Sequence, residues 1–398
     1  MPNLTTGAGF NDAAALLTSI TQQATGQQVI TPTTLDDFVS VGTLALQAGF
    51  DPLLNAISQV IGRTIFSIRP YSEKFGGLRA DSLRWGNHVR KLKIADNEWE
   101  RDQRYYEAAS DFWDDGDSVD MYTIKKAKAV QLNFYGQNIY EIQSPSIYMD
   151  QLDAAFRGPE ELNSFFSMIY TNIESQKEQK IEAVARMLLC NFIAAKISQS
   201  NGVIHALTEY NQETGQSLTS TTVMAPANFP AFIYWLYARM NTLARMMSER
   251  SQLFQFNVTG KVIMQHTPKE RLAVKMYAPF MDAINARVKS TTFNDEYLSA
   301  ATTEGVSFWQ SINSPKAINT TPTFLKADGT VGTAQSAVNN STVIGVMYDK
   351  DALGTITQNE RTMATPFNAK GHYSNIFNSF TEKWFTDFTE KGIVICLD

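Results

Sequence analysis

The stretch that decides the fold is residues 159–198, which read PEELNSFFSMIYTNIESQKEQKIEAVARMLLCNFIAAKIS. Apolar residues recur along it at the three- and four-residue spacing of a helix. Gly158 and Pro159 precede an acidic first turn, and Asn201-Gly202 follows the last apolar residue. The pattern therefore predicts one helix from Pro159 to about Ser200, roughly 60 Å long at 1.5 Å per residue. A coiled coil is the alternative, but the apolar residues lack a sustained heptad repeat.

Before this helix, residues 75–143 predict a long antiparallel ribbon. Two stretches, residues 88–94 (HVRKLKI) and 129–135 (AVQLNFY), alternate in polarity like half-exposed strands. Charged residues fill the segment between them. A two-stranded ribbon is marginal alone in water, so we expect another surface to lie against it. We also expect the ribbon to add little to the subunit's own core.

The remaining segments complete an α+β pattern. Residues 1–35 show a faint helical pattern and predict either an arm that needs a partner surface or a frayed terminus. After residue 222, helical and strand patterns alternate. The expected elements are helices at 229–249 and 268–286, strands at 261–264, 343–348 and 393–397, and a loop-like region at 314–341.

Composition excludes several classes of protein. The 398 residues are 43% hydrophobic and 19% charged, which supports a large core and excludes a disordered chain. The net charge of −6 leaves no overall basic footprint for nucleic acid. No Lys or Arg precedes Arg63, and no apolar run approaches 18 residues, so we expect neither a targeting signal nor a membrane span. The expectation is a soluble protein made in a reducing cytoplasm.

Motifs for catalysis, cofactors and metals are missing. The chain has no G-x-G-x-x-G, P-loop, H-E-x-x-H, C-x-x-C or G-x-S-x-G sequence. Its two cysteines and four histidines are too few for a disulfide framework or a four-thiolate zinc site. A calcium loop at 111–122 would need oxygen ligands where Trp113 and Tyr122 stand. We therefore predict no catalytic residue, no cofactor and no metal.

The order of these parts resembles the Hong Kong 97-type fold of tailed-phage major capsid proteins. Four stretches look like the capsid proteins of small short-tailed, protein-primed phages. They are residues 38–46 (FVSVGTLAL) leading into 57–63 (ISQVIGR), residues 130–138 (VQLNFYGQN), residues 346–351 (VMYDKD) and residues 375–384 (NIFNSFTEKW). The likeness covers roughly residues 30–398.

The resemblance implies a division into five parts. These are an N-terminal arm and entry helix (1–74), an E-loop hairpin (75–143), a P-domain with a spine helix (144–222), an A-domain (223–345) and returning A-domain and P-domain strands (346–398).

The implied function is a structural one, with no enzymatic activity. The chain would form hexamers and pentamers of an icosahedral or prolate head, assembled in the host bacterial cytoplasm. Scaffolding and portal proteins would be its partners, double-stranded DNA would touch it only by non-specific proximity, and no membrane would be involved. An encapsulin-type compartment is one alternative, and a soluble α/β enzyme is another.

In such a shell, the ribbon would contact neighbouring subunits through complementary charges and apolar anchors. The residues expected at this subunit interface are Arg90, Lys91, Lys93, Trp99, Trp113, Asp114, Asp115 and Asp117.

Overall fold

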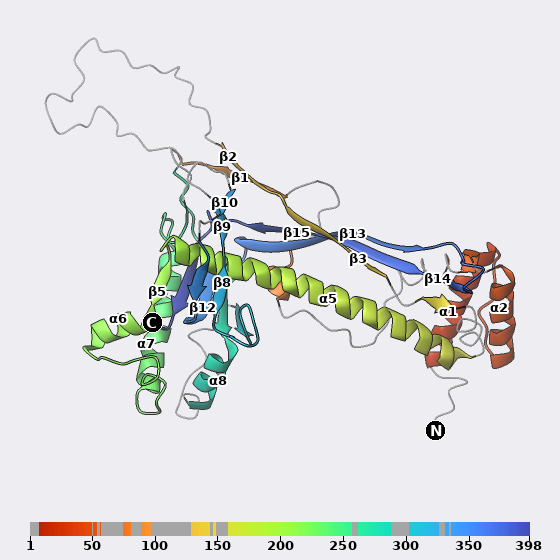
Figure 1. The fold of residues 1–398 in the computed structure, drawn as a ribbon, viewed down its shortest axis with the longest axis horizontal. Helices are drawn as coiled ribbons and strands as arrows, with labels where there is room; N and C mark the ends of the chain where they lie inside the picture. Colours follow the sequence, from red (N-terminus) through yellow and green to blue (C-terminus); the bar gives the residue numbers. More distant parts are fainter. Residues whose placement is uncertain are drawn as a thin grey trace, which may run out of the picture. The chain divides into compact units, whose positions relative to one another are not determined.

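The computed structural model describes residues 8–49, 51–53, 56, 75–80, 89–96, 129–143, 146–148, 158–256, 262–287, 302–325, 331–333 and 336–398. Helices and strands both contribute extensively to it (Figure 1). The chain forms two compact units. Unit 1 comprises Met1–Gly86, Gly136–Val184 and Thr355–Lys383, and unit 2 comprises Asn87–Tyr135, Ala185–Gly354 and Trp384–Asp398.

The long helix is present as predicted. Helix α5 runs without a break from Pro159 to Ser198, and it belongs to unit 1 up to Val184 and to unit 2 beyond it. Its polar middle, residues 175–180, has no buried side chain. There Lys177 Nζ lies 2.9 Å from Glu360 Oε1 in an ion pair on the surface of unit 1.

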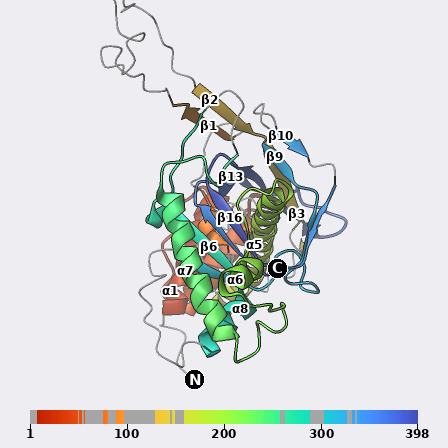
Figure 2. The same cartoon turned by 90° about the vertical axis from the view of Figure 1, so that its left-hand side faces the viewer.

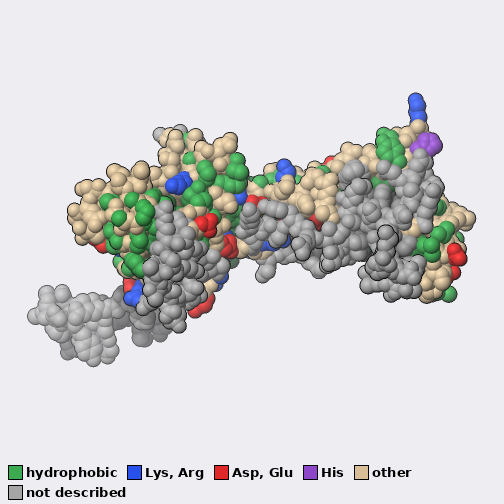
Figure 3. Space-filling view, turned by 90° about the horizontal axis from the view of Figure 1, so that it is seen from below, with side chains coloured by type: hydrophobic (Ala, Val, Ile, Leu, Met, Phe, Trp, Pro, Cys, Tyr) green, Lys and Arg blue, Asp and Glu red, His purple; other side chains and the backbone are tan. Residues whose placement is uncertain are grey.

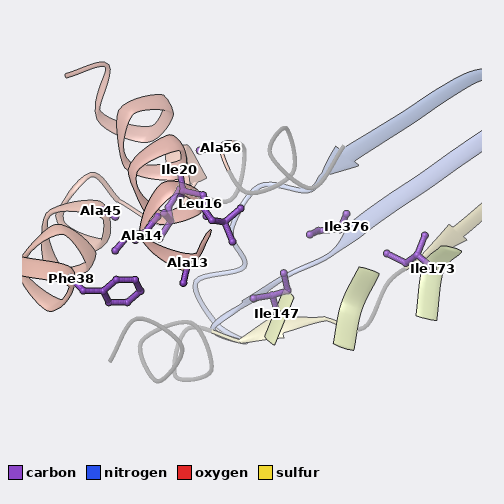
Figure 4. Close-up of a cluster of buried hydrophobic side chains, with 12 residues drawn as sticks. Ala13, Ala14, Leu16, Ile20, Phe38, Ala45, Ala56, Ile147, Ile173 and Ile376 are labelled. Atoms are coloured by element: carbon purple, nitrogen blue, oxygen red, sulfur yellow. The ribbon is translucent and has the colours of Figure 1, made fainter. Parts of the chain in front are cut away.

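Unit 1 contains a helical hairpin at the start of the chain. Helices α1 (Ala8–Thr25) and α2 (Leu35–Gln47) pack together, and Thr34 caps α2 by accepting a hydrogen bond from the Asp37 backbone N–H. Their inner faces bury Leu17, Ile20 and Phe38 completely. Figure 4 shows this core cluster together with isoleucines from other segments: Ile147 of β4 (Ile147–Tyr148), Ile173 of α5 and Ile376 of β15. The N-terminal segment therefore has a core within its own chain.

A three-stranded sheet runs through unit 1 in the order β13 (Leu353–Ala364), β15 (Ile376–Thr386) and β3 (Gly136–Gln143). Strand β14 (Tyr373–Ser374) pairs with β4 beside the helical hairpin's core cluster. A short 3-10 helix, η2 (Gly76–Leu78), precedes a bridge from Arg79 to Thr355 of β13.

Unit 2 is built on a five-stranded sheet. Its order is β5 (Val203–His205), β16 (Gly392–Cys396), β12 (Val343–Asp349), β6 (Leu272–Tyr277) and β7 (Thr302–Val306). Every residue of β6, β12 and β16 is buried, as expected for strands covered on both faces. The strands predicted at 343–348 and 393–397 are confirmed by β12 and β16.

Three helices accompany this sheet (Figure 2). Helix α6 (Ala206–Thr214) contacts β5 and β16, and α8 (Ala278–Arg287) contacts β6 and β7. Helix α7 (Phe229–Ser248) contacts both other helices, and it confirms the helix predicted at 229–249. No helix in the described part of the chain is long and apolar enough to cross a membrane.

Three sequence predictions in this region are wrong. The helix expected at 268–286 is instead a 3-10 turn, η5 (Lys269–Arg271), followed by β6 and then α8. A strand buried on both faces loses the alternation that distinguishes it from a helix, so LAVKMY gave no strand signal. Residues 262–264 form no strand. The loop-like region holds four three-residue strands: β8 (Ile318–Thr320), β9 (Thr323–Leu325), β10 (Val331–Thr333) and β11 (Val338–Asn340).

Candidate assembly interface at the ribbon base

The base of the predicted ribbon is a two-stranded antiparallel sheet in unit 2. Strands β1 (Val89–Ile94) and β2 (Ala129–Phe134) pair in register from Val89–Phe134 to Ile94–Ala129, which confirms both predicted strands. Residues 97–128, between the strands, lie outside the described residues. The predicted interface residues there are Trp99, Trp113, Asp114, Asp115 and Asp117, and they stay predictions.

One face of this ribbon base, the inner face, packs on the subunit's own chain. The inner face carries Val89, Lys91 and Lys93 of β1, opposite apolar residues of β2. The ring of Phe134 lies 5.8 Å from that of Phe385 near the end of β15, and the Lys91 ammonium lies 4.8 Å from the centre of the same Phe385 ring. Aromatic and cation–π contacts therefore hold the ribbon base against the rest of unit 2.

The two lysines of the inner face belong to a group of charged and polar residues, which we call the Asp387 cluster: Lys91, Lys93, Asp387, Thr389 and Glu390. Lys93 Nζ lies 3.1 Å from Asp387 Oδ2 and 2.5 Å from Glu390 Oε1, and Lys91 Nζ lies 3.3 Å from Asp387 Oδ2. The Asp387 side chain has no exposed surface. A carboxylate this buried is tolerated only when cations and hydrogen-bond donors surround it.

Electrostatics within the cluster favour the ionised carboxylate. Burial by itself raises the pKa of Asp387, but the ammonium groups of Lys93 and Lys91 and two hydrogen bonds from Thr389 outweigh burial and lower this pKa below its ordinary value. The Thr389 backbone N–H donates to Asp387 Oδ1 over 2.9 Å, and its hydroxyl donates to the same oxygen over 2.5 Å. The turn after β15 thus presents a preformed anionic site to β1.

These contacts correct one expectation. The ribbon was expected to add little to the subunit's own core, and that is wrong for its base, where Lys91 and Lys93 bind carboxylates of the same chain. Lys91 lies 296 positions from Asp387 and Lys93 lies 297 positions from Glu390, so no local pattern could pair them. Contact of Lys91 and Lys93 with a neighbouring subunit stays a prediction.

The opposite face of the ribbon base, the outer face, carries Arg90, Leu92 and Ile94. All three are exposed, with exposed fractions of 64% for Leu92 and 70% for Ile94. Across β2, Asn133 and Gln131 stand opposite Arg90 and Leu92. The ribbon therefore turns two lysines inward and two aliphatic side chains outward, the reverse of an ordinary half-buried strand.

Arg90 is the one predicted interface residue of β1 that the structure places on the exposed side. The prediction missed Leu92 and Ile94 because it selected the residues of β1 by their charge. The signal was present in the sequence, since alternation puts Leu92 and Ile94 on the same face as Arg90. Exposed aliphatic side chains that lie side by side mark interaction surfaces.

Metal ligands and thiols were the remaining candidates for chemistry in the described residues. They hold no group of three or more His, Cys, Asp or Glu that could bind a metal ion. Both cysteines are buried, and burial raises the pKa of each thiol to about 12, which keeps Cys190 and Cys396 protonated and unreactive at neutral pH.

Comparisons with known proteins point to one class. The family model for Phi29-like phage major capsid protein matches residues 15–388. A structure described as the head fiber and inner core protein gp22 of native bacteriophage P68 aligns with a TM-score of 0.52 and 9% identity, covering 84% of this chain and 87% of that chain. The capsid structure of Staphylococcus phage Andhra aligns with a TM-score of 0.50 and 8% identity, with the same coverage of each chain. No curated protein sequence matches the chain. At these identities the two structures show the fold alone.

Proposed function

We propose, from the premise that the chain belongs to the Phi29-like phage major capsid protein family, that it builds closed shells of hexamers and pentamers around double-stranded DNA. The chain is a structural capsid protein, and its mixed helix-and-sheet fold is that of phage capsid structures. The family match gives no support to the encapsulin and soluble-enzyme alternatives. The single observation that supports the proposed assembly is the outer face of the ribbon base.

Covering the outer face of the ribbon base by a neighbouring subunit would be energetically favourable. Leu92 and Ile94 leave about two thirds of their surfaces in water. Fully burying such a side chain is worth about 1.5–3 kcal/mol, so covering the pair would contribute about 2–4 kcal/mol per subunit. A closed shell repeats this contact at every subunit, and a modest gain at one interface accumulates over the whole particle.

The charge distribution of the chain favours weak, non-specific contact with DNA. The first 62 residues contain no Lys or Arg, and the whole chain carries a net charge of −6. On the face drawn in Figure 3, the basic and acidic side chains of described residues are interspersed, without one continuous basic patch. We propose that packaged DNA lies near this protein without being bound tightly, and that the measured affinity of the protein for DNA is very low at physiological salt.

The proposal extends to the partners and to the parts of the chain. A scaffolding protein and a portal protein would join the assembly in the host bacterial cytoplasm, and the shell would have no enzymatic activity. The five-part division into arm (1–74), E-loop (75–143), P-domain (144–222), A-domain (223–345) and returning strands (346–398) belongs to this proposal.

Electron microscopy and sedimentation of the expressed protein, alone and with its neighbouring gene products, test the assembly. We expect closed particles with hexameric and pentameric units. A protein that stays monomeric at high concentration, even with those gene products, would refute it.

A deletion tests the role of the ribbon. Replacing residues 97–128 by a short Gly/Ser turn leaves β1, β2 and the Asp387 cluster intact, so the subunit should keep its circular dichroism spectrum and melting temperature. We expect these subunits to form no stable shells. Normal shells from this variant would show that the ribbon beyond its base is dispensable for assembly.

A further inference from the structure

A second exposed apolar surface lies on helix α2 of unit 1. Leu35 and Val39 stand one helical turn apart, and their exposed fractions are 44% and 41%. Phe38 and Ala45, on an adjacent face of the helix, are fully buried in the helical hairpin's core cluster. Helix α2 therefore has an inner face that stabilises the subunit and an outer face, Leu35, Asp36 and Val39, that described residues cover only in part.

The outer face of α2 is acidic where it begins. Asp36 and Asp37 occupy the first turn and are both exposed. Asp37 already accepts a hydrogen bond from the Thr34 hydroxyl over 2.8 Å as part of the helix cap. Asp36 makes no ion pair with any other described residue, so its carboxylate is available to a cation from outside the chain.

The outer face of the ribbon base has the complementary chemistry. Arg90, Leu92 and Ile94 follow one another on one side of β1, and Arg90 makes no ion pair within the described part of the chain. Leu92 and Ile94 are two strand residues apart, about 6.8 Å, while Leu35 and Val39 are four helical residues apart, about 6 Å. The two aliphatic pairs therefore have similar spacing. On β1, Arg90 lies beyond Leu92, and on α2, Asp36 lies next to Leu35, which is the residue that would face Leu92.

We propose that the outer face of α2 in one subunit docks on the outer face of the ribbon base in a neighbouring subunit. Leu92 packs on Leu35, Ile94 packs on Val39, and Arg90 pairs with Asp36. The inference rests on the proposed shell, because the occupant is a second copy of this chain. Opposite charge and similar spacing on the two faces favour that occupant over an unrelated protein.

Cysteine cross-linking tests the geometry. One preparation carries Ile94→Cys and the other carries Val39→Cys with an affinity tag, and the two are co-assembled and mildly oxidised. Because the native Cys190 and Cys396 are buried, they do not compete. We expect a covalent dimer of tagged and untagged chains on a non-reducing gel, and because each chain carries only one introduced cysteine, the two introduced cysteines cannot pair within one chain.

Met363→Cys is the matched control, since Met363 is also exposed (54%) but lies on β13. Co-assembly of Met363→Cys with Ile94→Cys should give at least tenfold less dimer. Equal yields from the two pairs would overturn the proposal, as would cross-linking of Ile94→Cys to a different protein.

Charge reversal tests the pairing independently. Arg90→Glu and Asp36→Lys should each lower the yield of shells several-fold, and the double variant should restore it to within twofold of the wild type. Intact wild-type shells without the cross-link and without this rescue would overturn the docking while leaving the proposed function standing. Failure of the wild-type protein to form any shell would instead refute the proposed function, and this inference with it.

Discussion

Replacing Asp387 by Ala should loosen the ribbon base from the rest of unit 2 and destabilise the subunit. The lost carboxylate accepts from Lys93 at 3.1 Å, from Lys91 at 3.3 Å and from Thr389 at 2.5 and 2.9 Å. Breaking a buried ion pair costs about 3–5 kcal/mol. Lys93 keeps its 2.5 Å contact with Glu390, so part of its charge stays compensated. We therefore expect Asp387→Ala to lower the free energy of unfolding by an amount near the lower end of this range, about 3 kcal/mol.

The pH dependence of this loss follows from the lowered pKa of Asp387. A carboxyl whose folded-state pKa lies below its unfolded value stabilises the fold above the unfolded value, about 3.9 for Asp. That stabilisation disappears as the pH falls through the folded-state pKa. The loss caused by Asp387→Ala should therefore be the same at pH 7 and pH 5 and shrink only in stronger acid.

Urea unfolding of the unassembled subunit, followed by far-ultraviolet circular dichroism at pH 7 and pH 5, measures the effect. The matched control is Asp282→Ala, because Asp282 is exposed on α8, and it should stay within about 0.5 kcal/mol of the wild type. Raising the salt to 1 M should barely change the Asp387→Ala loss, because a buried pair is poorly screened. A loss below about 1 kcal/mol, equal to that of an exposed pair, would show that the cluster does not hold the ribbon base.

Three further predictions concern the subunit core. Burial lowers the pKa of Lys196 to about 7, so just above that pH the unfolded chain keeps a proton on this side chain that the folded chain has lost. Stability should rise from about pH 7 to about pH 8, below the range in which the thiols of the unfolded chain ionise, and Lys196→Met should reduce that rise in a pH series of urea unfolding. Gly202 has φ +75°, and a Cβ at this position would lie 2.5 Å from a backbone oxygen, whereas Gly215 has φ +70° and open space around it. Thermal melting should therefore show a clearly larger loss of stability for Gly202→Ala than for Gly215→Ala, where the backbone strain alone costs about 1–3 kcal/mol. Leu188→Ala on α5 should cost about 2–5 kcal/mol, whereas Met187→Ala, at a side chain 46% exposed, should cost far less in the same assay, and equal costs would contradict the core assignment.

The amino-acid sequence by itself determined the elements whose patterns are local. Helix α5 followed from helical spacing between a proline start and an Asn-Gly end, and the structure places it at Pro159–Ser198. Strands β1 and β2 followed from alternation, and β12 and β16 from short apolar runs near the end of the chain. In each case neighbouring residues carry the signal, because side-chain period and local propensity are properties of a short segment.

The tertiary structure alone decided which faces of these elements are covered. Strand β6 was mistaken for a helix because burial on both faces removes its alternation. The ribbon base turned its lysines inward because a buried Asp387, 296 positions away, outweighs the usual preference of aliphatic side chains for the interior. Leu92 and Ile94 were thereby left on the outside, where a capsid subunit can use them. Burial and charge pairing depend on residues distant in the chain, and only the folded arrangement brings those residues together.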